Sequence, residues 1–440
     1  MRRDGHSPGL RGPWVSQARS VLALTCSSAL RGLWTWSVAL ALLVACAAPA
    51  SPAAPAAPPA QGATPPAAPA GAAAAQAAPA AQTASTPSTG KQLLADLVAK
   101  ANAEGELSVL MVSTWNHALT EPLADAFKKR FGLTSNVTIS PVLGTQHLPV
   151  AIAETRAGTP PTYDAVYGDD AEMMQLIGAG ASMRIDNWEA LLAEINPAVG
   201  AGRVSPDQIS HGPLAGQAFA LVGNVKQILY NPRLISEADL PRRHADLADP
   251  RYKDKFIQPP WTAHWEIAPA VLDNLDRDQW LDTVRAAGKN GGAVLPEGPA
   301  VERVVLGQYP FALGQDTYLR LVRSKDPQAP IAARFFDDYN EYNALHNVVR
   351  AGTQHPAGAT LWVLWMTTAE AEAIWQPSEF YAQRYGESEI DRAQRQLIQD
   401  SGAKVVGLLD TPRAIELLDW YQSPDGRQYL DAMQKAIRGE

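Results

Sequence analysis

The sequence predicts an α/β fold built on a parallel sheet, preceded by an N-terminal region outside that fold. From about Lys91 onward, strand-like and helix-like segments alternate, which is typical of parallel sheets covered by helices. Residues 47–90 are almost entirely Ala, Pro, Gly, Gln, Ser and Thr, a composition that cannot bury a core. With 440 residues, the chain is long enough for two domains.

The N-terminal residues predict export. An apolar run over residues 33–45 follows a basic stretch and is short for a membrane span, so residues 1–45 are expected to be a signal peptide. The run ends in Leu43-Val44-Ala45-Cys46, which resembles the lipobox of bacterial lipoproteins and implies lipidation at Cys46. Residues 46–92 would then be a disordered tether that holds the chain to a membrane through the lipid anchor.

Charge and cysteine content exclude several classes of protein. The formal net charge is -8, and without a basic cluster we expect no binding to nucleic acid. The only cysteines are Cys26 and Cys46, so the rest of the chain has no disulfide, cysteine-ligated zinc or thiol nucleophile. No G-x-S-x-G, H-E-x-x-H or P-loop motif is present. We therefore expect a non-enzyme without cofactor or metal, although a catalytic pair of carboxylates stays open.

The first half of the globular region contains three expected strands, each followed by a helix. The strands are expected at 107–112, 136–142 and 164–167, and the helices at 120–131, with Thr120 as its cap, 147–157 and 170–177. Ligands of open parallel sheets bind at the carboxyl ends of the strands. This points to the loops at 113–117 and 168–170.

A second alternating region extends from about 217 to 346, and the last third is helical. The expected elements are strands at 219–221, 227–230 and 256–258 and helices at 266–275 and 278–287. Four tryptophans of the helical last third lie in amphipathic stretches, where they are expected to be core residues: Trp362, Trp365, Trp375 and Trp420.

The order of these segments, with two local motifs, resembles a known family. The motifs are Tyr230-Asn231 and the stretch 246–255, which reads DLADPRYKDK. Together they resemble the iron(III)/thiamine/polyamine branch of the type II periplasmic solute-binding proteins of ABC importers. The resemblance covers roughly residues 100–375. Residues 376–411 lie beyond it and are expected to be an insertion.

The resemblance implies two α/β lobes with a ligand cleft and two hinge crossings, near 217–227 and 340–350. Lobe one would comprise 93–218 and 349–440, and lobe two 219–348. The implied function is to bind a small extracellular solute in the cleft and deliver it to the permease subunits of an ABC transporter. The chain would be at the periplasmic or cell-surface face of the membrane.

Candidate ligand-binding residues follow the expected strands. Ser113, Thr114 and Trp115 suit an anionic group. Asp169 and Asp170 suit an ammonium or hydroxyl group, although Asp170 is also a candidate helix cap. Trp261, Thr262, His264 and Trp265 suit stacking on a planar or cationic ligand. Gln315, Asp316 and Tyr318 follow a strand expected at 311–313 and would face the cleft from lobe two. Asn224 and Asn347 lie on the hinge crossings and are weaker candidates.

Two alternatives remain within this interpretation. One is uptake of iron(III) or another metal ion, bound through scattered tyrosines: Tyr163, Tyr167, Tyr309 and Tyr318. Iron-binding members of the family use an adjacent tyrosine pair, which this sequence lacks. The other is a sensory lipoprotein that reuses the binding fold without a transporter.

Overall fold

The computed structural model describes residues 89–112, 117–142 and 144–440. The predicted signal peptide, Cys46, nearly all of the tether and the loop residues Ser113, Thr114 and Trp115 lie outside the described residues. Among the residues described, no helix has both the length and the apolar character needed to cross a membrane.

The strands form one mixed sheet in the order β2-β1-β3-β9-β4-β7-β5-β6, with β10 added to β9 and β8 to β4. Strand β1 is parallel to β2 and β3, whereas β9 is antiparallel to both β3 and β4. The bounds are β1 Glu106–Met111, β2 Asn136–Pro141, β3 Ala165–Asp169, β4 Ala218–Tyr230, β5 Phe256–Gln258, β6 Ala293–Val294, β7 Phe311–Gln315, β8 Ala332–Arg334, β9 Asn340–Val349 and β10 Val405–Val406.

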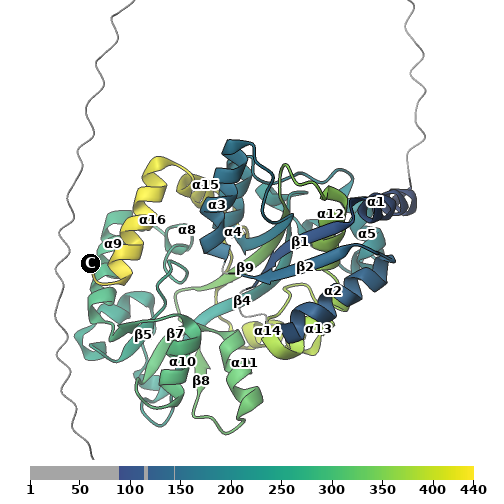
Figure 1. Ribbon diagram of the computed structural model, residues 1–440. Helices are drawn as coiled ribbons and strands as arrows, with labels where there is room; N and C mark the ends of the chain where they lie inside the picture. The colour runs from purple at the N-terminus through teal and green to yellow at the C-terminus, as the bar shows by residue number, and fades with distance from the viewer. Residues whose placement is uncertain (1–88, 113–116, 143) are drawn as a thin grey trace, which may run out of the picture. The chain divides into compact units, whose positions relative to one another are not determined.

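Two long strands, β4 and β9, connect two groups of shorter strands (Figure 1). The first part of β4, up to Val225, pairs with β9, and the part from Lys226 onward pairs with β7 and β8. The sequence analysis expected two separate strands here, but the structure has one continuous strand with a register irregularity between Ala220 and Val222. Strands β1, β2 and β3 therefore lie on one side of this two-strand connection, and β5, β6, β7 and β8 on the other.

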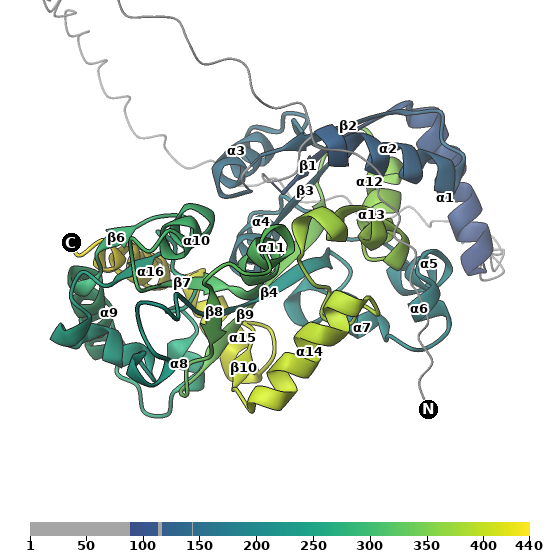
Figure 2. The same cartoon turned by 90° about the horizontal axis from the view of Figure 1, so that it is seen from below.

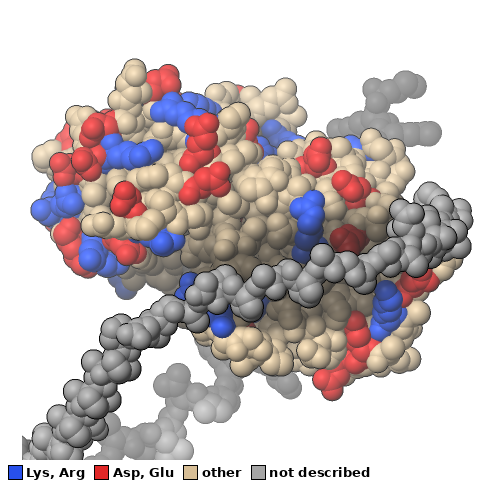
Figure 3. Space-filling model, turned by 90° about the horizontal axis from the view of Figure 1, so that it is seen from above, with Lys and Arg blue, Asp and Glu red and all other residues tan. Residues whose placement is uncertain are grey.

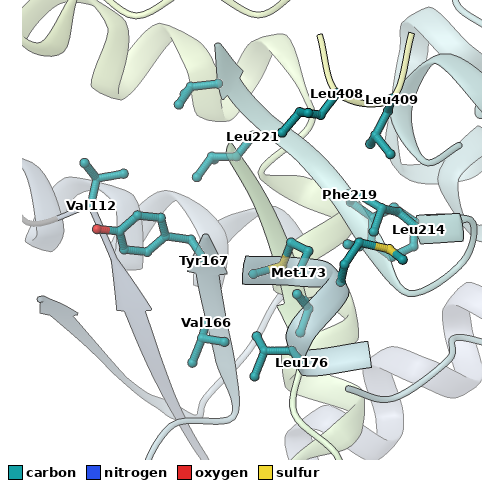
Figure 4. Packing of buried hydrophobic residues seen from close by; sticks show 14 of the residues in the cluster. Val112, Val166, Tyr167, Met173, Leu176, Leu214, Phe219, Leu221, Leu408 and Leu409 are labelled. Carbon is teal, nitrogen blue, oxygen red and sulfur yellow. The ribbon is translucent and has the colours of Figure 1, made fainter. Parts of the chain in front are cut away.

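Helices cover the first strand group, around a core that contains several large aromatic residues. The α-helices there are α1 Gly90–Glu104, α2 His117–Phe131, α3 Gly144–Ala157, α4 Asp170–Gly178, α5 Trp188–Ile195, α6 Pro197–Gly200, α7 Pro206–Ile209 and α12 Pro356–Trp365. Phe127 of α2 packs against Trp362 and Trp365 at ring-centroid distances of 5.2 and 5.5 Å. Both tryptophans and Trp375 are fully buried, which confirms the prediction that they are core residues, whereas the fourth, Trp420, is only half-buried at the edge of the core. Figure 4 shows the part of this core between β3, α4 and β4.

Helix α2 begins earlier than expected, so Thr120 lies inside it and is not its cap. At the second strand group, the expected helix at 266–275 is only the short α8, Ala268–Val271, followed by α9, Arg277–Asn290. The other helices of this group are α10 Glu297–Val305 and α11 Asp316–Lys325.

The C-terminal helix packs on the second strand group. Helix α16, Pro424–Ile437, lies along α9 (Figure 2), and Gln258 of β5 donates to the carbonyl of Ile437 at 2.8 Å. From the sequence, all of 349–440 was expected to belong to lobe one. The contacts place the last helix with the other group, because burial of its apolar face against α9 decides its position and chain order does not.

The expected insertion, 376–411, contacts the connecting strand β4 and helix α11 of the second strand group. It contains the end of α13, Ala369–Glu379, together with α14, Glu389–Ser401, and β10, and it leads into α15, Pro412–Tyr421. The amide of Gly223 donates to Ala382 at 2.7 Å, and Arg320 of α11 donates to the carbonyl of Phe380 at 2.9 Å. The segment therefore lies beside β4 and α11 rather than forming a separate domain.

Candidate functional site

One face of the β4–β9 ribbon carries polar and charged side chains. Asn224 lies directly opposite Asn343 in the register, and the next residues on the same face are Lys226 and Glu341, because side chains alternate between faces along a strand. Lys226 and Glu341 are 4% and 1% exposed. Buried charges of this kind need partners.

Lys226 is held by two side chains of the second strand group. Its ammonium lies 3.2 Å from an oxygen of Glu297 and 3.0 Å from the amide oxygen of Gln315. Trp261 donates its indole N–H to the same Glu297 oxygen at 3.0 Å. Glu297 thus fixes both a cation and an aromatic ring at one place.

The loop after β5 brings His264 to the same region in a strained conformation. Its φ is 89°, which is costly for a residue with a Cβ. The conformation is held from both sides, since the His264 N–H donates to Glu341 at 3.0 Å and the hydroxyl of Tyr339 donates to the His264 carbonyl at 2.7 Å. The imidazole is fully buried, and neither ring nitrogen has a hydrogen-bond partner among the described residues. A buried ring with two unsatisfied nitrogens is a site for a ligand or water.

The end of β3 brings two more carboxylates to the ribbon. Asp169 caps α4 by accepting from the amide of Glu172 at 2.9 Å. The alternative that Asp170 is the cap is therefore wrong. Asp170 instead lies 2.6 Å from His346, oxygen to Nε2, and is buried.

The carboxylates repel one another and favour an additional positive charge. Burial raises the pKa of Glu341 to about 7, against the opposing effect of Lys226. Burial, followed by the charges of Glu341 and Asp169, raises the pKa of Glu266 well above its usual range. Burial also raises the pKa of Asp169, and Asp170 adds to this. A bound cation would allow these groups to ionise together. We call Asp169, Lys226, Glu266, Glu297 and Glu341 the acidic cluster.

This cluster differs from the exterior of the protein. On the surface seen in Figure 3, Lys and Arg side chains are interspersed with Asp and Glu. The surface charge there forms no region of a single sign that would point to a partner. The concentration of carboxylates is a feature of the interior.

The structure brings together several of the predicted ligand residues. Trp261, His264, Gln315 and Asp169 lie in or next to the acidic cluster through the contacts above, and Thr262 donates to Glu266. Tyr318 is half-buried near Glu297, and burial raises its pKa. Asn224 is buried on the face that carries Lys226. Their contact with a ligand stays a prediction.

Three predicted residues lie elsewhere or are fully engaged. Trp265 is a core residue, fully buried against Trp280. Asp316 accepts four hydrogen bonds, from the amides of Val225 and Thr317 and from the side chains of Arg320 and Gln394. Asn347 is six residues along β9 from Glu341, a separation of about 20 Å in a strand.

Three of the four tyrosines considered for a metal ion have contacts in separate places, and the fourth, Tyr318, lies near Glu297. Tyr167 and Tyr309 donate their hydroxyls to backbone carbonyls at 3.0 and 3.2 Å, and the ring of Tyr163 packs on that of His147. Within the described residues, no group of three or more His, Cys, Asp or Glu residues is arranged to hold a metal ion.

Sequence reasoning missed Lys226, Glu297 and Glu341 as site residues. A signal for Lys226 is present, because it interrupts the apolar run from Ala218 to Tyr230 and an unpaired lysine in a buried strand is costly. Glu297 and Glu341 have no comparable local signal. Their role depends on which strands and loops meet.

Comparison with solved structures identifies the fold. Iron-bound HitA from Pseudomonas aeruginosa superposes with a TM-score of 0.59 at 18% identity, covering 75% of this chain and 99% of that one. The apo ferric ion-binding protein A of Pasteurella haemolytica gives a TM-score of 0.58 at 15% identity, covering 76% of this chain and 99% of that one. An ABC-transporter substrate-binding protein from Agrobacterium tumefaciens gives a TM-score of 0.54 at 17% identity, covering 77% of this chain and 97% of that one.

The chain therefore has the fold of the type II periplasmic binding proteins, as the sequence analysis predicted. No family model matches the sequence, and no curated protein matches it. At these identities the likeness extends to the fold, and the function is argued from the site.

Proposed function

We propose that this chain is an exported, lipid-anchored binding protein that captures a small cationic organic solute and delivers it to an ABC-type importer. The fold supports capture between two lobes joined by β4 and β9. The lobe division we propose is the predicted one, with α16 placed in lobe two. The signal-peptide and lipobox patterns of the sequence support export and anchoring.

The observation that carries the proposal is the buried acidic cluster around one lysine, beside a histidine with two unsatisfied ring nitrogens. An ammonium group would compensate the carboxylates that Lys226 leaves unpaired. Trp261 is partly exposed next to this charge, where an indole ring can stack on a cation or a planar group. The neutral imidazole of His264, whose pKa burial lowers well below its usual range, can accept from an ammonium N–H.

A thermal-shift screen of the full chain tests the proposal. Diamines, polyamines, thiamine and aromatic amines should raise the melting temperature, because a ligand that binds only the native state stabilises it by mass action. Sugars and dicarboxylates of similar size should not. Stabilisation by anions or sugars alone would contradict the cationic assignment.

A matched pair of variants locates the binding. Glu297→Gln removes the charge that holds Lys226 and Trp261, and we expect at least a tenfold loss of affinity for the amine found in the screen, since charge-assisted bonds are the stronger ones. Glu302→Gln changes the same residue type on the exposed face of the same helix and should bind as the unchanged protein does. Equal affinities in the two variants would place the amine elsewhere.

Iron(III) is the second candidate, because several of the structural neighbours are described as ferric-binding proteins. The acidic cluster supplies carboxylate oxygens, although among the described residues no three such groups are arranged to hold a metal ion and the scattered tyrosines do not converge. Titration with ferric citrate distinguishes the two candidates. A visible charge-transfer band, together with stabilisation by iron but by none of the amines, would favour iron.

Lipidation and transport need separate tests. Radiolabelled palmitate should enter the chain in bacteria and fail to enter Cys46→Ser. Cells that lack the chain should lose uptake of the identified solute. Uptake that is unchanged, with altered gene expression on exposure to the solute, would favour the sensory alternative.

A further inference from the structure

A cavity of about 210 Å³ lies on the other face of the β4–β9 ribbon, opposite the acidic cluster. Side chains alternate between faces along a strand, so this face carries the residues between those of the cluster. Its sheet wall is formed by Ala220, Leu221 and Val222 of β4 and by Tyr342, Ala344 and His346 of β9.

Besides Arg130 of α2 and residues between Thr367 and Glu372, two further parts of the chain complete the walls. One is the segment from Asn196 to His211, which includes the apolar side chains of Val204 and Ile209. The other is the expected insertion, which contributes residues 383–387. The insertion thus closes a pocket against β4 and β9.

The arginines that line the cavity are each paired with a carboxylate. Arg384 lies 2.8 Å from Asp410 and stacks over the ring of Tyr342 at 4.6 Å. Arg203 lies 2.8 Å from Glu387, and Arg130 lies 3.4 Å from Glu370. None of these positive charges is left to attract an anion.

Two further ionisable groups of the lining, Glu372 and His211, have shifted pKa values that favour their neutral forms at physiological pH. Burial, with a further contribution from Asp391, raises the pKa of Glu372 to about 9. Burial, and then the charge of His346, lowers the pKa of His211. His346 is buried, its Nε2 lies against Asp170, and its Nδ1 has no hydrogen-bond partner among the described residues. The cavity therefore combines mostly apolar walls with two histidines, His211 and His346.

We propose that this cavity is a second binding site, for a small uncharged aromatic molecule whose one polar group lies against the histidines of the lining, His211 and His346. The volume exceeds the roughly 150 Å³ of engineered apolar cavities that bind benzene. A single ring with one hydroxyl group fits, and a charged ligand would meet no unpaired counter-charge. The site is separate from the acidic cluster and does not depend on what that cluster binds.

The test uses p-cresol as the probe with the full chain. Saturable binding, measured by calorimetry, and a rise in melting temperature are expected. The charged analogues 4-methylbenzoate and benzylammonium should bind at least tenfold more weakly, because burying an unpaired charge is costly.

Two variants show whether the probe occupies this cavity. Ala344→Phe fills the cavity from β9 and should abolish p-cresol binding, whereas Ala373→Phe, at an exposed position of α13, should leave it unchanged. If Ala344→Phe does not fold, the ring protons of His346 give an independent readout in the unmodified protein by NMR and should shift on titration. Absence of saturation up to the solubility limit, or binding that leaves both the variant and the histidine signals unaffected, would overturn the proposal.

Discussion

The two faces of the β4–β9 ribbon differ in almost every property that decides what they bind. One face carries Lys226 and Glu341 within a cluster of buried carboxylates. The other carries Tyr342 and Ala344 and lines a cavity in which the charges are paired or neutralised. The same two strands supply both, because neighbouring residues of a strand point in opposite directions.

The difference teaches that the charged face is the less stable arrangement in the absence of a ligand. Asp169, Glu266 and Glu341 have raised pKa values, which is a free-energy cost of keeping these carboxylates together without a compensating cation. On the cavity side, among the described residues, a cost of this kind falls on one carboxylate only, Glu372 of α13, whose pKa is raised to about 9. Substitutions on the first face should therefore have larger effects than those on the second.

The largest effect is expected for Lys226→Met, which leaves Glu297 buried without its cation. Removing one partner of a buried ion pair costs about 3 to 5 kcal/mol. Denaturant unfolding measures this loss. Lys325→Met, at the exposed end of α11, is the control and should change stability by less than about 0.5 kcal/mol. If Lys226→Met also lost less than about 0.5 kcal/mol, the result would show that the cluster is already solvated.

The pH dependence of stability should differ between the unchanged protein and Glu341→Gln. Because the pKa of Glu341 is raised to about 7 when folded, the native state holds a proton that the unfolded state has released. Its contribution to stability is complete below the unfolded pKa and is lost as the pH rises through about 7. The loss amounts to about 3 kcal/mol, because each unit of pKa shift corresponds to about 1.4 kcal/mol. Between pH 5 and pH 8, the free energy of unfolding should fall less in Glu341→Gln than in the unchanged protein. An equal fall in both proteins would contradict the raised pKa of Glu341.

A smaller effect is expected at His264, where the backbone is strained. At a φ of 89°, Gly is tolerated and Ala is not, so His264→Gly should be about 1 kcal/mol more stable than His264→Ala. Both variants should bind the amine more weakly, since both lack the imidazole. Equal free energies of unfolding for the two variants would indicate that the loop relaxes to an unstrained conformation.

The smallest effect is expected at the rim of the cavity. The pair Arg203–Glu387 is 2.8 Å apart, with about half of each side chain exposed. Exposed pairs contribute about 0 to 1 kcal/mol, so Arg203→Ala should barely change the unfolding midpoint, at low or high salt. A larger loss would mean that the insertion depends on this contact to stay on β4.

The order of strands and helices could be predicted from the sequence because it depends on local periodicity. Strands β1, β2 and β5 and helices α3 and α4 lie close to their expected bounds. The acidic cluster could be predicted only in part. Trp261 and His264 follow a recognisable strand, whereas Glu341 joins them only because β9 pairs with β4, which is more than 100 residues earlier in the chain.

Local patterns do not determine the packing partner of a side chain. Trp265 has the same local setting as Trp261 but points into the core against Trp280, and Asp316 has the setting of a ligand residue but joins α11 to β4 and α14. Helix α16 has a clear apolar face, but the sequence does not show which element packs on it, and in the structure that element is α9.

By itself, the sequence determined the class of fold, the patterns that predict export and anchoring, and the loops where polar residues follow strands, since each depends on composition or short-range spacing. Only the tertiary structure decided which face of β4 and β9 each residue occupies, and hence that buried carboxylates surround Lys226 while an uncharged cavity lies behind them. The reason is that strand register and long-range pairing bring together residues that are far apart in the chain.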